Sequence, residues 1–197
     1  MHAFSTSTPE HHPHRRIGLG VRAVAVAATV TGAIALTGTI SHPAVMLTAV
    51  DIGPGASVTP APGWVVAQQG PGFVLLQNAF STAEMEIRVK PAPGTDPVAA
   101  LQGDVNNVSG TVTGLSNVSN LAPPVTKPVP GANFQQEASI DYTANGSTQM
   151  GAIPVIGTFI ELLNTSTHQS AFIVFAQNGD ALSRVDNEGG AMVDSML

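Results

Sequence analysis

Eighteen consecutive residues without a charge, Ala23 to Ile40, constrain this chain more than any other feature. As a helix rising 1.5 Å per residue they would span about 27 Å, close to the roughly 30 Å hydrocarbon core of a bilayer. Arg15, Arg16 and Arg22 precede the stretch, and no Lys or Arg follows it until Arg88. Because positive charges stay on the cytoplasmic side, this pattern predicts one transmembrane helix with the C-terminal part of the chain outside the cytoplasm.

We therefore expect four segments: a cytoplasmic tail at 1–16, a transmembrane helix or uncleaved signal anchor at 17–42, a linker at 43–62 and an extracytoplasmic domain at 63–197. The expected location is the cell membrane, crossed once. The alternative is a cleaved signal peptide, which would release the domain as a secreted soluble protein. Since no clean Ala-x-Ala cleavage pattern occurs between Leu36 and Gly55, we favour the retained anchor.

The expected outer part of the chain is strongly acidic. Residues 51–197 hold twelve acidic side chains and four basic ones. A surface with this balance repels nucleic acid and anionic lipid headgroups, so neither is expected as a partner. The chain has no Cys, which excludes disulfides, thiol nucleophiles, thiolate metal sites and the Cys of a lipoprotein anchor.

Alternating apolar and polar residues predict a β-sheet. Residues 64–90 are interpreted as a β-meander, with the only Trp, Trp64, in the core at its start. The last strand of the meander, 83–90, alternates apolar with charged residues, so one face should pack on a core and the other should face water. Further strands are predicted at 138–144, 155–163 and 170–176, of which the last two are expected to be central and buried.

Two helices are predicted around these strands. Asp96-Pro97 is typical of a helix start, because Asp96 can accept hydrogen bonds from free backbone N–H groups and Pro97 suits the first helical position. A second helix is expected near the C-terminus, with Asp180 as its cap. Apolar residues spaced by three and four, Met192 and Val193 among them, should place one face of this helix on the sheet.

The connections give weaker signals. Asn145-Gly146 is the favoured pair for a tight hairpin turn, so a turn is predicted there. Pro154 cannot donate a ladder hydrogen bond and is expected at an edge or a bulge. The segment 108–133 mixes Gly, Ser, Asn and Pro and is interpreted as a long loop, mobile or functional, with a short edge strand around 111–118 as an alternative for part of it.

No catalytic, cofactor-binding or metal-binding residue is identified, and no cofactor is expected. A serine-type hydrolase needs an imidazole base, and a zinc site needs several imidazoles or thiolates. Beyond residue 42 the chain has a single His, His168, which is predicted to lie in a solvated turn. Glu84 and Glu86 share a strand face. Because Arg88 and Lys90 lie beside them, they are interpreted as part of an exposed surface on which acidic and basic side chains form ion pairs.

The order of elements carries a resemblance: a meander opening Thr59-Pro60-Ala61-Pro62-Gly63-Trp64, the Asp96-Pro97 helix start, three strands and a C-terminal helix ending Val193-Asp194-Ser195-Met196-Leu197. This resembles the PsbP-like α/β/α fold, in particular the LpqN-type extracytoplasmic proteins of actinobacterial envelopes. The resemblance implies an α+β fold class, with an antiparallel sheet packed between helices after the N-terminal transmembrane helix. The missing anchor Cys departs from the lipoprotein members and favours a single-span form.

These observations predict a membrane-anchored extracytoplasmic binding or scaffolding module of the cell envelope without enzymatic activity. Besides the membrane that holds its N-terminal helix, its partner would be an envelope lipid, glycan or protein. The alternative is an envelope hydrolase that acts with carboxylates alone. Such an enzyme needs two acids at a suitable separation across a cleft.

Overall fold

The computed structural model describes residues 48–53, 55–108, 114–120, 122–148, 151–182 and 184–197. The predicted cytoplasmic tail and transmembrane helix, 1–42, lie outside the described residues. Within the described part of the chain, no helix has the length and apolarity needed to cross a membrane.

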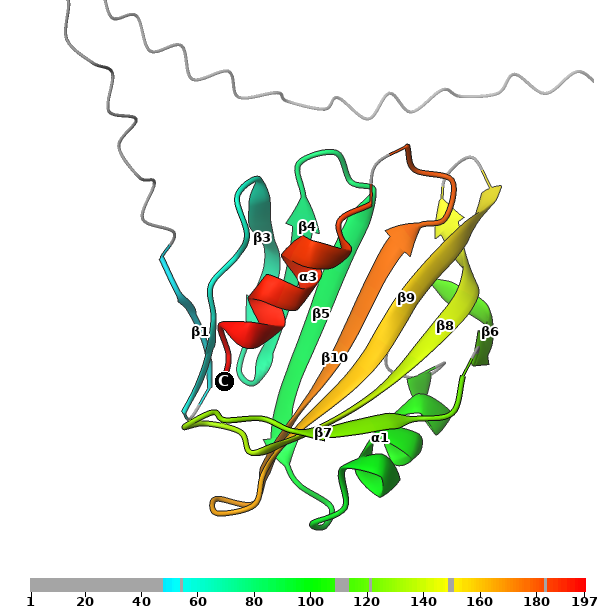
Figure 1. Ribbon diagram of the computed structural model, residues 1–197. Coiled ribbons are helices and arrows are strands. Elements are labelled where there is room, and N and C mark those ends of the chain that lie inside the picture. The colour runs from blue at the N-terminus through cyan, green and yellow to red at the C-terminus, as the bar shows by residue number, and fades with distance from the viewer. Residues whose placement is uncertain (1–47, 54, 109–113, 121, 149–150, 183) are drawn as a thin grey trace, which may run out of the picture. The chain divides into compact units, whose positions relative to one another are not determined.

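The described residues form mostly antiparallel strands (Figure 1). The main sheet has the strand order β3-β4-β5-β10-β9-β8-β6, and β7 also pairs with β8. A separate two-stranded sheet is formed by β1 and β2. The strands are β1 (Val50–Gly53), β2 (Ala56–Val58), β3 (Trp64–Gly70), β4 (Phe73–Asn78), β5 (Ala83–Pro91), β6 (Leu115–Asn120), β7 (Val125–Pro128), β8 (Gln136–Thr148), β9 (Gly151–Asn164) and β10 (Gln169–Asn178), and the helices are α1 (Pro97–Asn106) and α3 (Asp186–Asp194).

One face of the sheet is covered by α3, which lies over β4, β5 and β10 (Figure 1). Met192 and Val193 of α3 are buried there, as the spacing of apolar residues predicted. Trp64 belongs to the same core and is 6% exposed, so its predicted place at the start of the meander is confirmed. A Cβ on Gly189 would approach the Phe175 ring to 2.8 Å, which explains why the helix carries glycine where it meets the sheet.

The opposite face carries a second apolar core beneath α1, which contacts β8 and β9. Leu101 of α1 is buried against three aromatic rings: Tyr142 stacks on Phe159 with ring centroids 4.0 Å apart, and Phe159 lies 6.0 Å from Phe172. The predicted helix start is confirmed, since the Asp96 carboxylate accepts hydrogen bonds from the first free N–H groups of α1. Burial on both faces is what lets β9 and β10 be apolar along most of their length.

The predicted fold class is wrong. It combined an N-terminal transmembrane helix with a PsbP-like α/β/α sheet packed between helices. The described chain is instead dominated by antiparallel strand, and its two helices, of ten and nine residues, each cover only part of one face. On the face that carries α3, the part of the sheet beyond the helix shows half-buried Ile156 and Thr158 on β9 and exposed Asp141 on β8.

Three local predictions also fail. Asn145-Gly146 makes no turn, because β8 runs through it and pairs with β9 as far as Thr148 opposite Gly151. Asp180 does not cap the C-terminal helix, which begins six residues later at Asp186. Pro154 lies neither on an edge strand nor at a bulge, because β9 is a central strand with an unbroken register. It lies one residue beyond the last β9–β10 pair, where its carbonyl accepts a hydrogen bond from the Gly179 N–H.

Two segments expected to be irregular contain strands. The segment 108–133 holds β6 and β7, which pair with different parts of β8. The β1–β2 hairpin lies within the predicted linker 43–62 and contributes Ile52, Ala56 and Val58 to the core under α3. The compact unit, Ala44–Leu197, therefore begins before the domain boundary expected at residue 63.

Candidate binding pocket at one end of the sheet

A pocket of about 260 Å³ opens at the end of the sheet where β4 turns into β5. Its walls come from this turn, from the start of β6, from the paired ends of β8 and β9, and from the end of β10. The volume is below the roughly 300–1,000 Å³ of drug-sized ligand sites. The pocket therefore suits one small chemical group or one side chain of a larger partner.

A row of cross-strand neighbours explains the hollow. Across the face that carries α1, Gln77 pairs with Glu84, Glu84 with Ala176, Ala176 with Gly157, and Gly157 with Tyr142. Of the two small residues in the middle of the row, Ala176 lines the pocket beside Glu84, and Gly157 is covered by the Tyr142 ring. The ring is held by its hydroxyl, which donates a hydrogen bond of 3.2 Å to a backbone carbonyl of β10.

Gly157 is needed for this arrangement. A Cβ at this position would lie 2.0 Å from the Phe175 carbonyl oxygen and 2.8 Å from the Tyr142 ring. Glycine inside a strand often marks such a close approach. The pocket thus depends on a residue that lines no wall but lets Tyr142 lie against the sheet.

Among the described residues that line the pocket, Glu84 is the only ionisable one. Burial raises the pKa of its carboxyl, and the nearby Glu86 carboxylate adds to the increase. Glu86 itself forms an ion pair with Arg88. Among the described residues, no Lys, Arg or His forms an ion pair with Glu84 or lines the pocket. Burial and the charge of Glu84 together raise the pKa of the Tyr142 hydroxyl.

The rim is held by hydrogen bonds between neighbouring connections. The Asn78 side-chain oxygen accepts from the backbone N–H groups of Thr82 and Ala83, which orders the β4–β5 turn. The Asn178 N–H donates to the Thr82 carbonyl at 2.8 Å, which joins this turn to the end of β10. Gln177 accepts from the Val185 N–H and donates to Asp186, so the connection into α3 is tied to the same place.

Two large apolar side chains extend from these joined connections into solvent. Phe80, in the β4–β5 turn, is 84% exposed, and Leu182, between β10 and α3, is fully exposed. Each of these side chains leaves apolar surface in contact with water. The two side chains thus belong to the same end of the sheet as the Glu84 pocket.

A second polar cluster is closed off beneath α1. Glu161 on β9 is 0% exposed, and neither carboxyl oxygen has a hydrogen-bond partner of good geometry. Its neighbours are Ser170 on β10, Asp104 on α1, and Lys90 on β5, which is ion-paired with Asp104. Burial and the Asp104 charge raise the pKa of Glu161 to about 8, against the opposing effects of Ser170 and Lys90. This cluster joins α1 to the sheet and lines no wall of the pocket.

No protein-family model matches the chain, and no curated protein is similar to it in sequence. Similarity is found among solved structures. A point mutant of protein Mog1 superimposes with a TM-score of 0.50 at 12% identity, over 76% of this chain and 94% of that one. The fold resembles that of Mog1. At this identity the likeness concerns the fold alone.

Two further structures match less closely. The Saccharomyces cerevisiae Ran-binding protein Mog1p has a TM-score of 0.45 at 10% identity, over 73% of this chain and 80% of that one. Human STARD10 has a TM-score of 0.34 at 8% identity, over 66% of this chain and 68% of that one.

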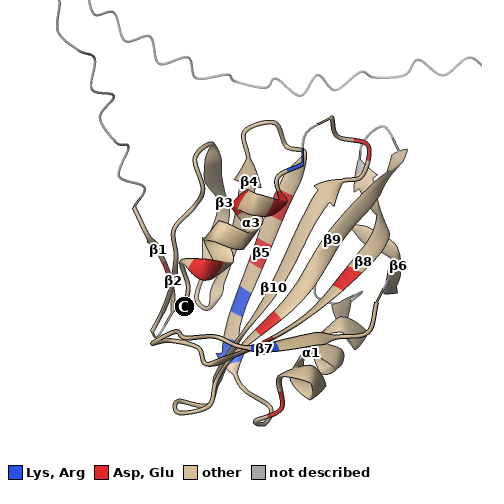
Figure 2. Cartoon of the chain, viewed as in Figure 1, with Lys and Arg blue, Asp and Glu red and all other residues tan. Residues whose placement is uncertain are grey.

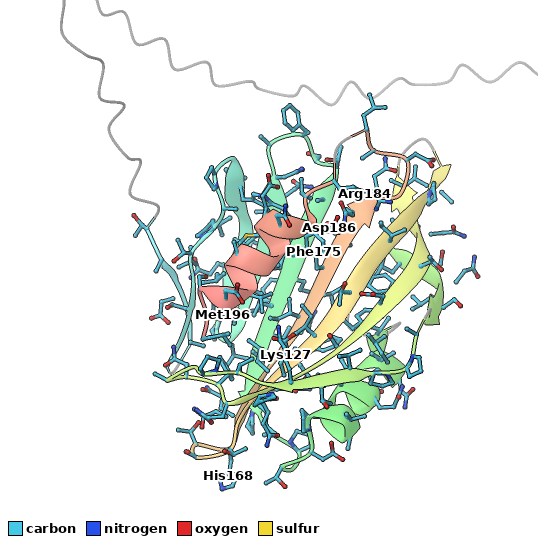
Figure 3. The ribbon with its side chains drawn as sticks, in the orientation of Figure 1. Lys127, His168, Phe175, Arg184, Asp186 and Met196 are labelled. Atoms are coloured by element: carbon cyan, nitrogen blue, oxygen red, sulfur yellow. The ribbon has the colours of Figure 1, made fainter. Side chains whose placement is uncertain are left out.

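The residues considered from sequence have different places. His168 is exposed in the predicted turn, at the opposite end of the sheet from Arg184 and Asp186 (Figure 3). Glu84 and Glu86 share a face as predicted, but Glu86 is buried beside Arg88, so the interpretation of this face as open to solvent is wrong. In the described part of the chain, no three His, Cys, Asp or Glu residues gather as metal ligands would.

Sequence reasoning missed the pocket itself. Its floor comes from strands more than seventy residues apart, and no local motif marks their meeting. The one available signal is Gly157, an isolated glycine in an otherwise apolar and β-favouring run, which indicates close packing at that point.

Proposed function

We propose that this chain is a membrane-anchored extracytoplasmic binding or scaffolding module of the cell envelope and that its binding site is the Glu84 pocket. The observation that carries the proposal is a small pocket with one carboxyl group that lacks a countercharge, bordered by exposed Phe80 and Leu182. A charged group without a partner and exposed apolar side chains both cost free energy in an isolated protein. Both costs are relieved when a partner covers this end of the sheet.

The composition of the pocket favours binding over catalysis. A hydrolase that uses carboxylates alone needs a second acid across the cleft. Glu84 is the one acid among the described lining residues, and Glu86, further along the same strand face, is ion-paired with Arg88. We therefore propose a non-enzymatic role.

The proposed location rests on the sequence. The charge-free stretch Ala23–Ile40 follows three arginines, which orients the acidic C-terminal part away from the cytoplasm. Protease added to spheroplasts should cut within residues 51–197 while cytoplasmic proteins stay intact. Protection of this segment, when known external domains are degraded, would refute the orientation.

The binding role is tested by crosslinking the full chain in its own membranes and purifying it with the molecules attached. The informative variant is Phe80→Ser combined with Leu182→Ser, because both side chains are exposed and their loss should not affect folding. The matched control is Val125→Ser on β7, which is 63% exposed and lines no wall of the pocket.

We expect one lipid, glycan or protein to be recovered with the parent and the control and lost with the double variant. Equal recovery from all three proteins would refute a binding site at this end of the sheet. Hydrolysis of an envelope glycan by the purified chain, abolished by Glu84→Gln, would establish the enzyme alternative instead.

A further inference from the structure

We infer that the Glu84 pocket takes a primary ammonium group, carried by a lysine side chain of a partner or by a small alkylamine. This inference rests on the proposal that the pocket is a binding site, and it specifies the chemistry of the ligand. The pocket contains one carboxyl group and no Lys, Arg or His among its described lining residues.

Basic residues are sparse at this end of the sheet, where exposed Arg184 precedes α3 (Figure 3). The Lys and Arg residues of β5 and β7 lie toward the other end, whereas acidic residues on β5 and in the first part of α3 lie toward the pocket end (Figure 2). Arg88 and Lys90 are paired with Glu86 and Asp104, and Lys127 is paired with Glu137. Arg184 precedes α3 but does not line the pocket. A bound cation would supply the charge that Glu84 lacks.

The shape of the lining favours ammonium among the common cations. Gln77 on β4, Glu84 on β5 and Asn178 at the end of β10 line the pocket, and strand alternation places all three on the same face of the sheet. The three donors of an ammonium group point in different directions and suit such acceptors, whereas a guanidinium presents a flat fork. Leu115 and Ile153 provide apolar surface for the methylene stem of an amine.

The ionisation of Glu84 gives the inference a pH signature. The charge of Glu86 on the same strand acts on Glu84, and Tyr142 is the ionisable side chain reached across β10 and β9. Because the pKa of Glu84 is raised, protonation removes the charge that would hold a cation at a higher pH than for an ordinary Glu. An alkylammonium group keeps its charge below neutral pH, so binding should weaken as the pH falls.

The test is a titration of the ¹⁵N-labelled full chain, in mild detergent, followed by the backbone amide signals of Glu84, Ser147 and Asn178. The probes are N-acetyl-lysine-N-methylamide, n-butylammonium, the neutral Nε-acetylated form of the lysine probe, and butyrate. The variant Glu84→Gln keeps the shape of the side chain and removes its charge. The control Asp194→Asn removes one exposed negative charge of α3 away from the pocket.

We expect both ammonium probes to bind and the neutral and anionic probes to bind at least tenfold more weakly. Glu84→Gln should weaken ammonium binding at least tenfold at pH 7, and Asp194→Asn should change it less than twofold. Lowering the pH from 7 to 5 should weaken binding to the parent but not to Glu84→Gln. Tighter binding of the lysine probe than of n-butylammonium would identify a peptide side chain as the source of the amine, and equal binding would identify a small amine.

Two results would overturn the inference in distinguishable ways. If the neutral probe or butyrate binds as tightly as the ammonium probes and Glu84→Gln has no effect, the pocket is a binding site but not one for a cation. If no probe shifts the three amide signals, the pocket is not a site for small groups and the proposed function fails with it.

Discussion

The buried carboxyl group of Glu161 should make the stability of this protein fall as the pH rises. The pKa of Glu161 is raised from its ordinary value of 4.5 to about 8, chiefly by burial and then by the Asp104 charge. A group whose pKa is raised in the folded state contributes stability that is fully present at pH values below its pKa in the unfolded state. This stability is lost as the pH rises toward 8. Glu161→Gln replaces the protonated acid by a neutral group of the same shape and should remove this dependence.

The size of the effect follows from the pKa interval. At about 1.36 kcal/mol per pH unit, the interval from 4.5 to about 8 corresponds to at most about 5 kcal/mol. Between pH 5 and pH 8 the parent should lose roughly 3 kcal/mol relative to Glu161→Gln. Lys90, which is ion-paired with Asp104, can approach the ionised group, so the measured loss should lie at or below this figure.

The measurement is urea unfolding of the full chain at pH 5, 6, 7 and 8, followed by tryptophan fluorescence. Trp64 is the only Trp and is buried against the α3 core, so its emission reports unfolding of the sheet and helix together. Asp194→Asn serves as the control and should parallel the parent at every pH. A difference between Glu161→Gln and the parent that stays constant from pH 5 to pH 8 would refute the description of Glu161 as buried and protonated.

Two further predictions concern the cores and use the same unfolding assay at pH 7. Ile140 is 3% exposed in the core beneath α1, so Ile140→Asp places an unpaired carboxylate there and should lower the free energy of unfolding by several kcal/mol. The control Val125→Asp, on the exposed strand β7, should lower it little. An Ile140→Asp protein as stable as the parent would contradict the assigned face. Gly157→Ala pushes a methyl group into a backbone carbonyl at 2.0 Å and should cost about 2 kcal/mol or more, whereas Gly190→Ala, with no atom within 4 Å, should be neutral or stabilising by about 0.5–1 kcal/mol. Equal effects of the two glycine changes would contradict the close approach at Gly157.

Much of the local structure could be predicted because single stretches carry their own pattern. The Asp96-Pro97 start of α1 depends on neighbouring residues and is confirmed. The alternation along β5 correctly predicts which residues share a face, but not that its charged face is partly buried. The apolar density of β9 and β10 also placed them at the centre of the sheet. Each of these signals is contained within about ten residues.

The failures involve competition between local preference and distant pairing. Asn145-Gly146 favours a turn, but continued pairing of β8 with β9 provides more hydrogen bonds than a tight hairpin at that point would. Asp180 is a good cap residue, yet the chain between β10 and α3 is tied to Gln177 and the helix starts only at Asp186. The Glu84 pocket needs Ala176 and Gly157 beside each other, which only the strand order reveals.

The most direct test of the central proposal is zero-length carbodiimide crosslinking of the full chain in its own membranes, followed by mass spectrometry of the Glu84 peptide. A carbodiimide joins a carboxyl group to a primary amine within contact distance, with loss of water. The proposed function and ligand chemistry predict that Glu84 is recovered in an amide bond with an amine of its partner. Recovery of Glu84 unmodified, with coupling confined to exposed carboxylates such as Asp180, would contradict them.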